Sequence, residues 1–193
     1  MEIKILKECG YEEALIGISL SRNQPLENMP KVAELLAPKD KGHNKFMESI
    51  YIWLDITAPR FFWQEADTYR LSTKQSASTM YSITQRELNQ TDFEYEIPPM
   101  VLDEINAKIN HYNNSINSSP TIKEFYFTSI KNILPEGFLQ RRIWVMNYKC
   151  LRNIYYQRKT HRLPQWNYFC EETIERIEHP ELIIKEKEQG SKE

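Results

Sequence analysis

The chain has 193 residues, of which 40% are hydrophobic and 12% aromatic, a composition typical of a folded globular protein rather than a disordered one. Its formal net charge of −2 gives the molecule no general electrostatic preference for nucleic acid or for an anionic membrane. The three cysteines and four histidines are widely scattered, which excludes a disulfide framework and a metal-ligand cluster by spacing. We therefore expect a protein of the reducing cytoplasm with no metal site.

The length fits one domain, which we expect over residues 1–184, followed by a charged, flexible tail over residues 185–193. No apolar run approaches the roughly 18 residues that a membrane-spanning helix needs. The first ten residues mix charged with single apolar groups, unlike a signal peptide. These features predict no membrane association.

The first half of the chain shows alternating strand and helix patterns. Residues 2–9 alternate apolar and charged groups and predict a strand, while residues 11–21 carry apolar groups at helical spacing. A short apolar stretch over 32–36 predicts one more helical piece. Residues 50–56 alternate isoleucine and leucine with aromatic and acidic groups, which predicts a second strand with one aliphatic face.

The segment over residues 59–82 changes from aromatic-rich to polar composition near its middle. Pro59 suits a helix start, and we expect a helix from there towards Arg70, rich in aromatic groups. Leu71 to Ser82 consists mostly of hydroxyl, amide and small side chains, too polar for a core element. We expect a loop here, which either lines a polar ligand site or satisfies its own backbone.

The second half predicts helices over 100–114 and 120–134, a strand near Leu139 and a last helix from Pro164. Within it, residues 139–170 contain no Asp or Glu and hold these cations: Arg141, Arg142, Lys149, Arg152, Arg158, Lys159 and Arg162. Such a local basic field predicts either an anion site or a solvated face. Interleaved aromatic residues also fit a single-stranded nucleic-acid binder, against which the overall negative charge argues.

Several motifs resemble those of flavin-dependent thymidylate synthases. Their signature R-H-R-x-x-S-x-N-E-x-S-x-R-Y-S is similar to the pattern here of Arg70, Thr73, Gln75, Ser78, Tyr81 and Ser82. This copy departs from the signature at Thr68, Tyr69, Ser76 and Met80. Weaker resemblances are Gly42-His43 with Glu48, Leu134-Pro135, Asn147-x-Lys149 and Gln165-Trp166. The sequence over 134–183 is similar to that of members carried by bacterial viruses.

The resemblance implies an α/β (α+β) fold with a twisted, mostly antiparallel sheet flanked by helices. It implies reductive methylation of dUMP to dTMP with FAD, NADPH and methylenetetrahydrofolate, in a homotetramer whose sites lie between subunits. For a viral member the location would be the host cytoplasm. The departures from the signature leave open a non-catalytic relative that binds or sequesters a nucleotide.

The resemblance also implies roles for individual residues. Ser78 would lie beside the reacting pyrimidine as the catalytic residue. FAD would be bound by His43, Glu48, Arg70, Thr73 and Gln75. The nucleotide would be bound by Glu65, Ser78, Tyr81, Arg141, Arg142, Lys149, Arg158 and Lys159.

Overall fold

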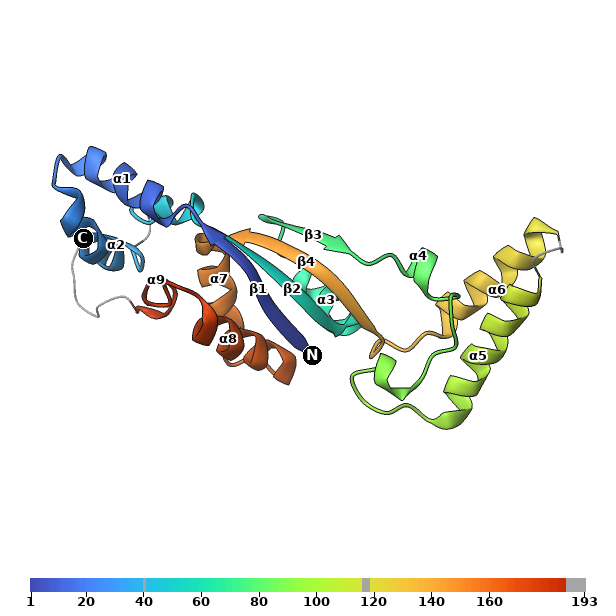
Figure 1. Cartoon of the computed structure of the whole chain (residues 1–193). Helices are drawn as coiled ribbons and strands as arrows, with labels where there is room; N and C mark the ends of the chain where they lie inside the picture. The colour runs from blue at the N-terminus through green and yellow to red at the C-terminus, as the bar shows by residue number, and fades with distance from the viewer. Residues whose placement is uncertain (40, 116–118, 187–193) are drawn as a thin grey trace. The chain divides into compact units, whose positions relative to one another are not determined.

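A computed structural model describes residues 1–39, 41–115 and 119–186 (Figure 1). Within these residues four strands form one antiparallel sheet, in the spatial order β1-β2-β4-β3. Their bounds are β1 (Glu2–Cys9), β2 (Tyr51–Pro59), β3 (Ser72–Ser76) and β4 (Leu139–Asn147). The predicted fold class, helices around a mostly antiparallel sheet, is confirmed. The aliphatic face predicted for β2 is the buried one, since Ile52, Leu54 and Ile56 are fully enclosed.

The described helices fall close to the predicted patterns. Prolines occupy the first turns of α5, α6 and α8, where a missing N–H and a fixed φ are compatible with a helix start. The helices and 3₁₀ turns are α1 (Tyr11–Arg22), η1 (Leu26–Asn28), α2 (Met29–Leu36), η2 (Lys45–Glu48), α3 (Arg60–Ala66), α4 (Thr79–Ser82), η3 (Gln90–Asp92), α5 (Pro99–Asn114), α6 (Pro120–Ile133), α7 (Tyr148–Arg158), α8 (Pro164–Arg176) and α9 (Glu181–Ile184). None of these described helices has the length and apolar content that a membrane crossing requires.

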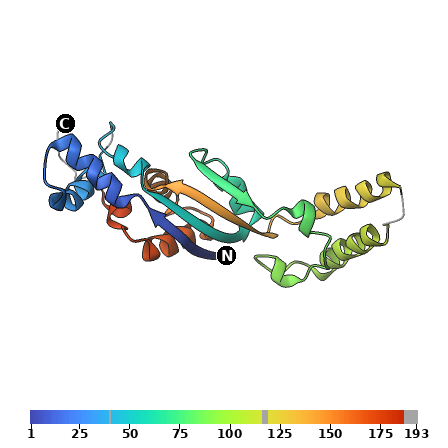
Figure 2. The same cartoon turned by 45° about the horizontal axis from the view of Figure 1, so that its top comes forward.

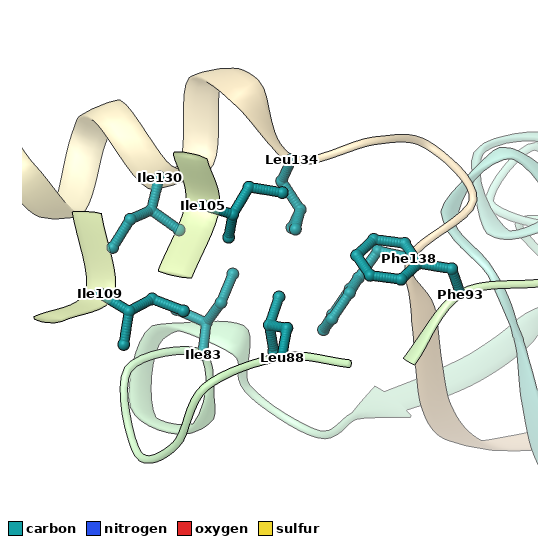
Figure 3. Close-up of a cluster of buried hydrophobic side chains, with 8 residues drawn as sticks. All are labelled: Ile83, Leu88, Phe93, Ile105, Ile109, Ile130, Leu134 and Phe138. Carbon is teal, nitrogen blue, oxygen red and sulfur yellow. The ribbon is translucent and has the colours of Figure 1, made fainter. Parts of the chain in front are cut away.

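The chain divides into two compact units, so the predicted single domain over 1–184 stays a prediction. The first unit comprises residues 1–2, 57–68 and 75–142. In it α5 and α6 run side by side (Figure 1, Figure 2). Their facing side chains join the loops around them in one apolar cluster (Figure 3), made of Ile83, Leu88, Phe93, Ile105, Ile109, Ile130, Leu134 and Phe138.

The second unit comprises residues 3–56, 69–74 and the described residues from 143 onward. Its core is aromatic where β4 meets α8, because Trp144 contacts Trp166 and Phe169 at ring-centroid distances of 6.5 and 5.4 Å. Asn147 ends β4 and starts α7, since its side-chain oxygen accepts a hydrogen bond of 2.9 Å from the Cys150 N–H. This cap fixes where the basic stretch turns from strand to helix.

One prediction about local structure is wrong, and one stays open. The segment over 71–82 is not a loop throughout, because Ser72–Ser76 forms β3 and Thr79–Ser82 forms α4. Pairing with β4 satisfies the β3 backbone groups that face it, and the Trp144 indole donates a hydrogen bond of 2.9 Å to the Ser72 hydroxyl. Of the predicted tail, Lys185 and Glu186 are described and make contacts, whereas residues 187–193 lie outside the described part.

Candidate functional site

The first unit contains a pocket of about 240 Å³ that is rich in cations. Side chains from α3, α4 and β4, together with the end of α6, form its wall: Arg60, Gln64, Thr79, Lys131, Leu134, Gln140 and Arg142. Three of these lining residues carry a positive charge, and none carries a negative one. Such a lining attracts an anion.

Arg60 is anchored at one side of this pocket by two partners. Its guanidinium donates a hydrogen bond of 3.1 Å to the Leu134 carbonyl and forms an ion pair of 3.2 Å with Glu136. Glu136 also accepts a hydrogen bond of 2.8 Å from the Gln64 amide. Arg60 therefore has a fixed position, and its charge is partly compensated by Glu136.

Arg142 is held more rigidly, between an aromatic ring and a carboxylate. Its guanidinium lies 4.7 Å from the centroid of the Trp63 ring and donates to both carboxylate oxygens of Asp67, at 3.0 and 3.1 Å. A further N–H donates to the Gln140 side chain at 3.0 Å, while its Nε is buried and has no hydrogen-bond partner in the described structure. This orphaned N–H is a donor that a ligand could satisfy.

Lys131 differs from both arginines because no carboxylate among the described residues compensates its charge. Its Nζ donates a hydrogen bond to the Thr79 hydroxyl, and no described carboxylate lies within ion-pair distance of it. Burial lowers the pKa of the Lys131 ammonium, and the nearby positive charge of Arg60 lowers it further. An anion in this pocket would relieve that repulsion.

Lys131 carries no mark of a ligand residue in the sequence pattern around it. A lysine in the last turn of an amphipathic helix is already explained by its favourable interaction with the helix dipole. The one feature that could have indicated a ligand contact is its position three residues before Leu134-Pro135, one of the motifs that carry the family resemblance.

The predicted ligand residues of the first unit lie partly in this pocket. Arg142 lines it, whereas Glu65, Gln75, Ser78, Tyr81 and Arg141 are not among its lining residues. The Ser78 hydroxyl oxygen accepts a hydrogen bond of 3.2 Å from the Met80 N–H and so caps α4, which leaves its proton available to a ligand. Tyr81 is 80% exposed and can move to meet one.

In the second unit, two predicted ligand residues contact each other. Lys149 on α7 forms an ion pair of 2.5 Å with Glu48 on η2. His43 is exposed on the turn just before η2. The contact places the predicted phosphate cation and a predicted flavin residue at one location.

Arg158, at the end of α7, lies in an aromatic cage of the same unit. Its guanidinium is 4.7 Å from the centroid of the Trp166 ring, and its Nε donates a hydrogen bond of 2.8 Å to the Tyr69 hydroxyl. The His161 ring nitrogen lies 2.8 Å from another guanidinium nitrogen. Lys159, by contrast, points towards Tyr156 and Glu186. The two adjacent cations therefore have different surroundings.

Arg70 and Thr73 are exposed next to and on β3, where they can reach a ligand. Among the residues that the structure describes, no group of three or more His, Cys, Asp or Glu side chains could hold a metal ion.

Comparison with known proteins identifies a family and related structures. A sequence model of the family described as thymidylate synthase complementing protein matches residues 11–177. A structure of the flavin-dependent thymidylate synthase ThyX from Helicobacter pylori, complexed with FAD and dUMP, has a TM-score of 0.70 at 15% identity, with 95% of this chain and 98% of that chain covered. A second structure of ThyX from Helicobacter pylori with FAD and dUMP has a TM-score of 0.69 at 16% identity, with 95% and 97% covered. No curated protein matches the chain. At these identities the two structures demonstrate a shared fold.

Proposed function

Because the chain belongs to the thymidylate synthase complementing protein family, we propose that it binds a deoxyuridine nucleotide together with FAD, in the manner of flavin-dependent thymidylate synthases. The observation that carries this proposal is the pocket around Lys131. Both ThyX structures that share the fold contain FAD and dUMP, which supports the same ligand pair here.

The pocket fits the phosphate of a nucleoside monophosphate. Lys131 supplies an uncompensated ammonium, Thr79 a hydroxyl and Arg142 an orphaned N–H. Charge-assisted hydrogen bonds of this kind each contribute about 1.5 to 3 kcal/mol. The phosphate would therefore bind at Lys131, and the Ser78 hydroxyl and Tyr81 ring of the signature segment would serve the base.

The predicted flavin residues offer a suitable set of groups. Arg70 provides a cation for a pyrophosphate, Thr73 and Gln75 provide a hydroxyl and an amide, and His43 and Glu48 add an imidazole and a carboxylate. All five side chains are exposed, so a cofactor can reach them. Bound FAD, reduced by NADPH, would supply the hydride that methylation of dUMP by methylenetetrahydrofolate requires. The chain's own part is to hold the ligands in register.

The signature departures favour a second candidate, a relative that binds the nucleotide without turnover. Met80, where the family signature has an arginine, is 60% exposed and supplies no charge. Ser76 likewise replaces a carboxylate. Both candidates share the pocket and differ only in chemistry.

The binding proposal is tested by titrating dUMP into the wild type, Lys131→Ala and the control Lys123→Ala. Lys123 lies on the same helix, α6, but does not line the pocket. We expect Lys131→Ala to weaken binding by about 10- to 100-fold, since 1.4 kcal/mol corresponds to a factor of ten. Equal binding by all three proteins would refute the pocket assignment.

Turnover is decided separately. A tritium-release assay with dUMP, methylenetetrahydrofolate, FAD and NADPH reports the reaction, and the visible absorption spectrum of the purified protein reports bound flavin. Product formation establishes the synthase. Binding of dUMP without product formation supports the non-catalytic candidate, for which Lys149→Ala then tests the second predicted phosphate contact.

We further propose assembly as a homotetramer with sites between subunits. Ile122 and Phe125, on the outer side of α6, are 44% and 63% exposed, which supports burial of this face against another copy. Solution scattering at micromolar concentration is expected to give the mass of four chains, and a monomer mass would contradict the proposal. A cytoplasmic location remains our prediction.

A further inference from the structure

The structure continues in an ordered form past the part of the chain that matches the family. The match ends at residue 177, yet α9 and the residues up to Glu186 pack onto the second unit. Leu182 and Ile183 are fully buried there. Residues 181–186, which we term the C-terminal clasp, are therefore an integral part of this unit.

The clasp is held by one stripe of α7. Arg152 donates hydrogen bonds of 3.1 and 2.5 Å to the carbonyls of Leu182 and Ile183, and one of 2.6 Å to that of Lys185. Tyr156 donates one of 2.7 Å to the Ile184 carbonyl. These four carbonyls lie at and just after the end of α9, where the described residues offer them no helical partner, so α7 satisfies groups that the helix end leaves open.

An ion pair closes the same stripe. Lys159 lies 3.2 Å from Glu186, and the hydrogen bond between them raises the pKa of the Lys159 ammonium. Arg152, Tyr156 and Lys159 are four and three residues apart, which places them on one helix face. The clasp therefore runs along α7 in the same direction as that helix.

The other side of the clasp contacts α2. The two helices α9 and α2 pack together, and Lys185 forms an ion pair of 3.5 Å with Glu34. One turn before Arg152, α7 also packs against η2, where Lys149 pairs with Glu48. Thus α7 is held at neighbouring turns by the clasp and by η2.

We infer that the C-terminal clasp positions α7, and through α7 the η2 turn that carries Glu48, with Arg152 as the positioning residue. Arg152 lies one turn after Lys149, so movement of this part of α7 moves the partner of Glu48. An effect of the clasp on FAD or dUMP binding rests on the proposed function. The coupling between the clasp, α7 and η2 does not.

The inference is tested by hydrogen exchange on the full chain. Three variants form a graded series: Tyr156→Phe removes one of the four hydrogen bonds, Arg152→Lys keeps the charge, and Arg152→Ala removes both charge and donors. Arg162→Ala, at an exposed position of the same basic segment, is the matched control. The reporters are the Leu182 and Ile184 amides in the clasp, the Met47 amide in η2 and the Ser49 amide directly after it, all of which are hydrogen-bonded.

We expect Arg152→Ala to accelerate exchange at the clasp by about tenfold or more and at η2 by a smaller factor, with Arg152→Lys and Tyr156→Phe in between. The control Arg162→Ala should leave the exchange rates of the clasp and of η2 unchanged. Acceleration at the clasp alone would overturn the positioning role, and unchanged exchange at both would overturn the clasp. Titration of dUMP into Arg152→Ala adds the functional readout: about threefold weaker binding is expected. A wild type that binds neither FAD nor dUMP would reject the proposed function and leave the exchange result to decide the clasp.

Discussion

At the scale of single residues, Lys131 makes ligand binding depend on pH. Its pKa lies below the ordinary value of 10.5 because of burial and the charge of Arg60, so the free protein loses this proton earlier than an exposed lysine would. Only the protonated form attracts phosphate. We expect dUMP affinity to fall as the pH rises through the lowered pKa, and Lys131→Arg to abolish that fall. Calorimetric titrations across the alkaline range check this, and identical pH profiles for the two proteins would contradict it.

Glu8 makes stability depend on pH in the opposite sense to most carboxylates. It accepts hydrogen bonds from the Tyr148 hydroxyl and the Glu178 N–H, but burial dominates and raises the pKa of Glu8 above 4.5. The folded protein therefore keeps this proton at a pH where the unfolded chain has lost it. The contribution of Glu8 to the free energy of unfolding is fully present below pH 4.5 and is lost as the pH rises through the folded-state pKa.

Glu8→Gln removes this ionisation and keeps a hydrogen-bonding side chain. We expect its stability relative to the wild type to increase with pH between about 4 and about 7.5, measured by urea unfolding. The exposed Glu27→Gln serves as the control. A difference between Glu8→Gln and the wild type that is the same at both ends of this range would rule out the linkage.

At the scale of elements, the junction between β1 and α1 depends on Gly10. This residue has φ of +92°, and a Cβ there would lie 2.1 Å from the Ser49 carbonyl oxygen. Gly10→Ala is therefore expected to destabilise the protein by at least about 2 kcal/mol, through both backbone strain and steric overlap.

Gly17 provides a matched control inside α1. A Cβ there would meet no atom within 4 Å, and its position in a helix favours alanine. Gly17→Ala is expected to stabilise the protein by about 0.5 to 1 kcal/mol. Thermal unfolding of both variants separates the two effects, and equal shifts would show that the junction tolerates a side chain.

At the scale of the whole molecule, each unit has a core of its own. The first depends on the cluster between α5 and α6, in which Ile109 is completely buried. Ile109→Ala should cost about 2 to 5 kcal/mol, because the removed methyl groups leave a cavity. Met100→Ala, at a position of the same helix that is 76% exposed, should change stability by no more than about 0.5 kcal/mol. Denaturant unfolding measures the free energy of unfolding of both variants. A loss for Ile109→Ala as small as that for Met100→Ala would mean that the cluster contributes little to stability.

The sequence by itself determined the elements whose pattern is local. Alternation over 2–9 and 50–56 predicted β1 and β2, and prolines followed by helical spacing predicted α5, α6 and α8, because burial on one face imposes a period of two in strands and 3.6 in helices. The spacing of the signature motif also predicted the family, which the match over residues 11–177 confirms.

Only the tertiary structure decided what depends on partners distant along the chain. The hydroxyl-rich segment after Leu71 became β3 because β4 pairs with it, some 70 residues later. Lys131 joined Arg60 and Arg142 in one pocket, and Arg152 donated a hydrogen bond to the carbonyl of Lys185, the residue at which composition had predicted a tail to begin. Such contacts leave no period in the sequence, since their energy comes from groups that folding alone brings within hydrogen-bond distance.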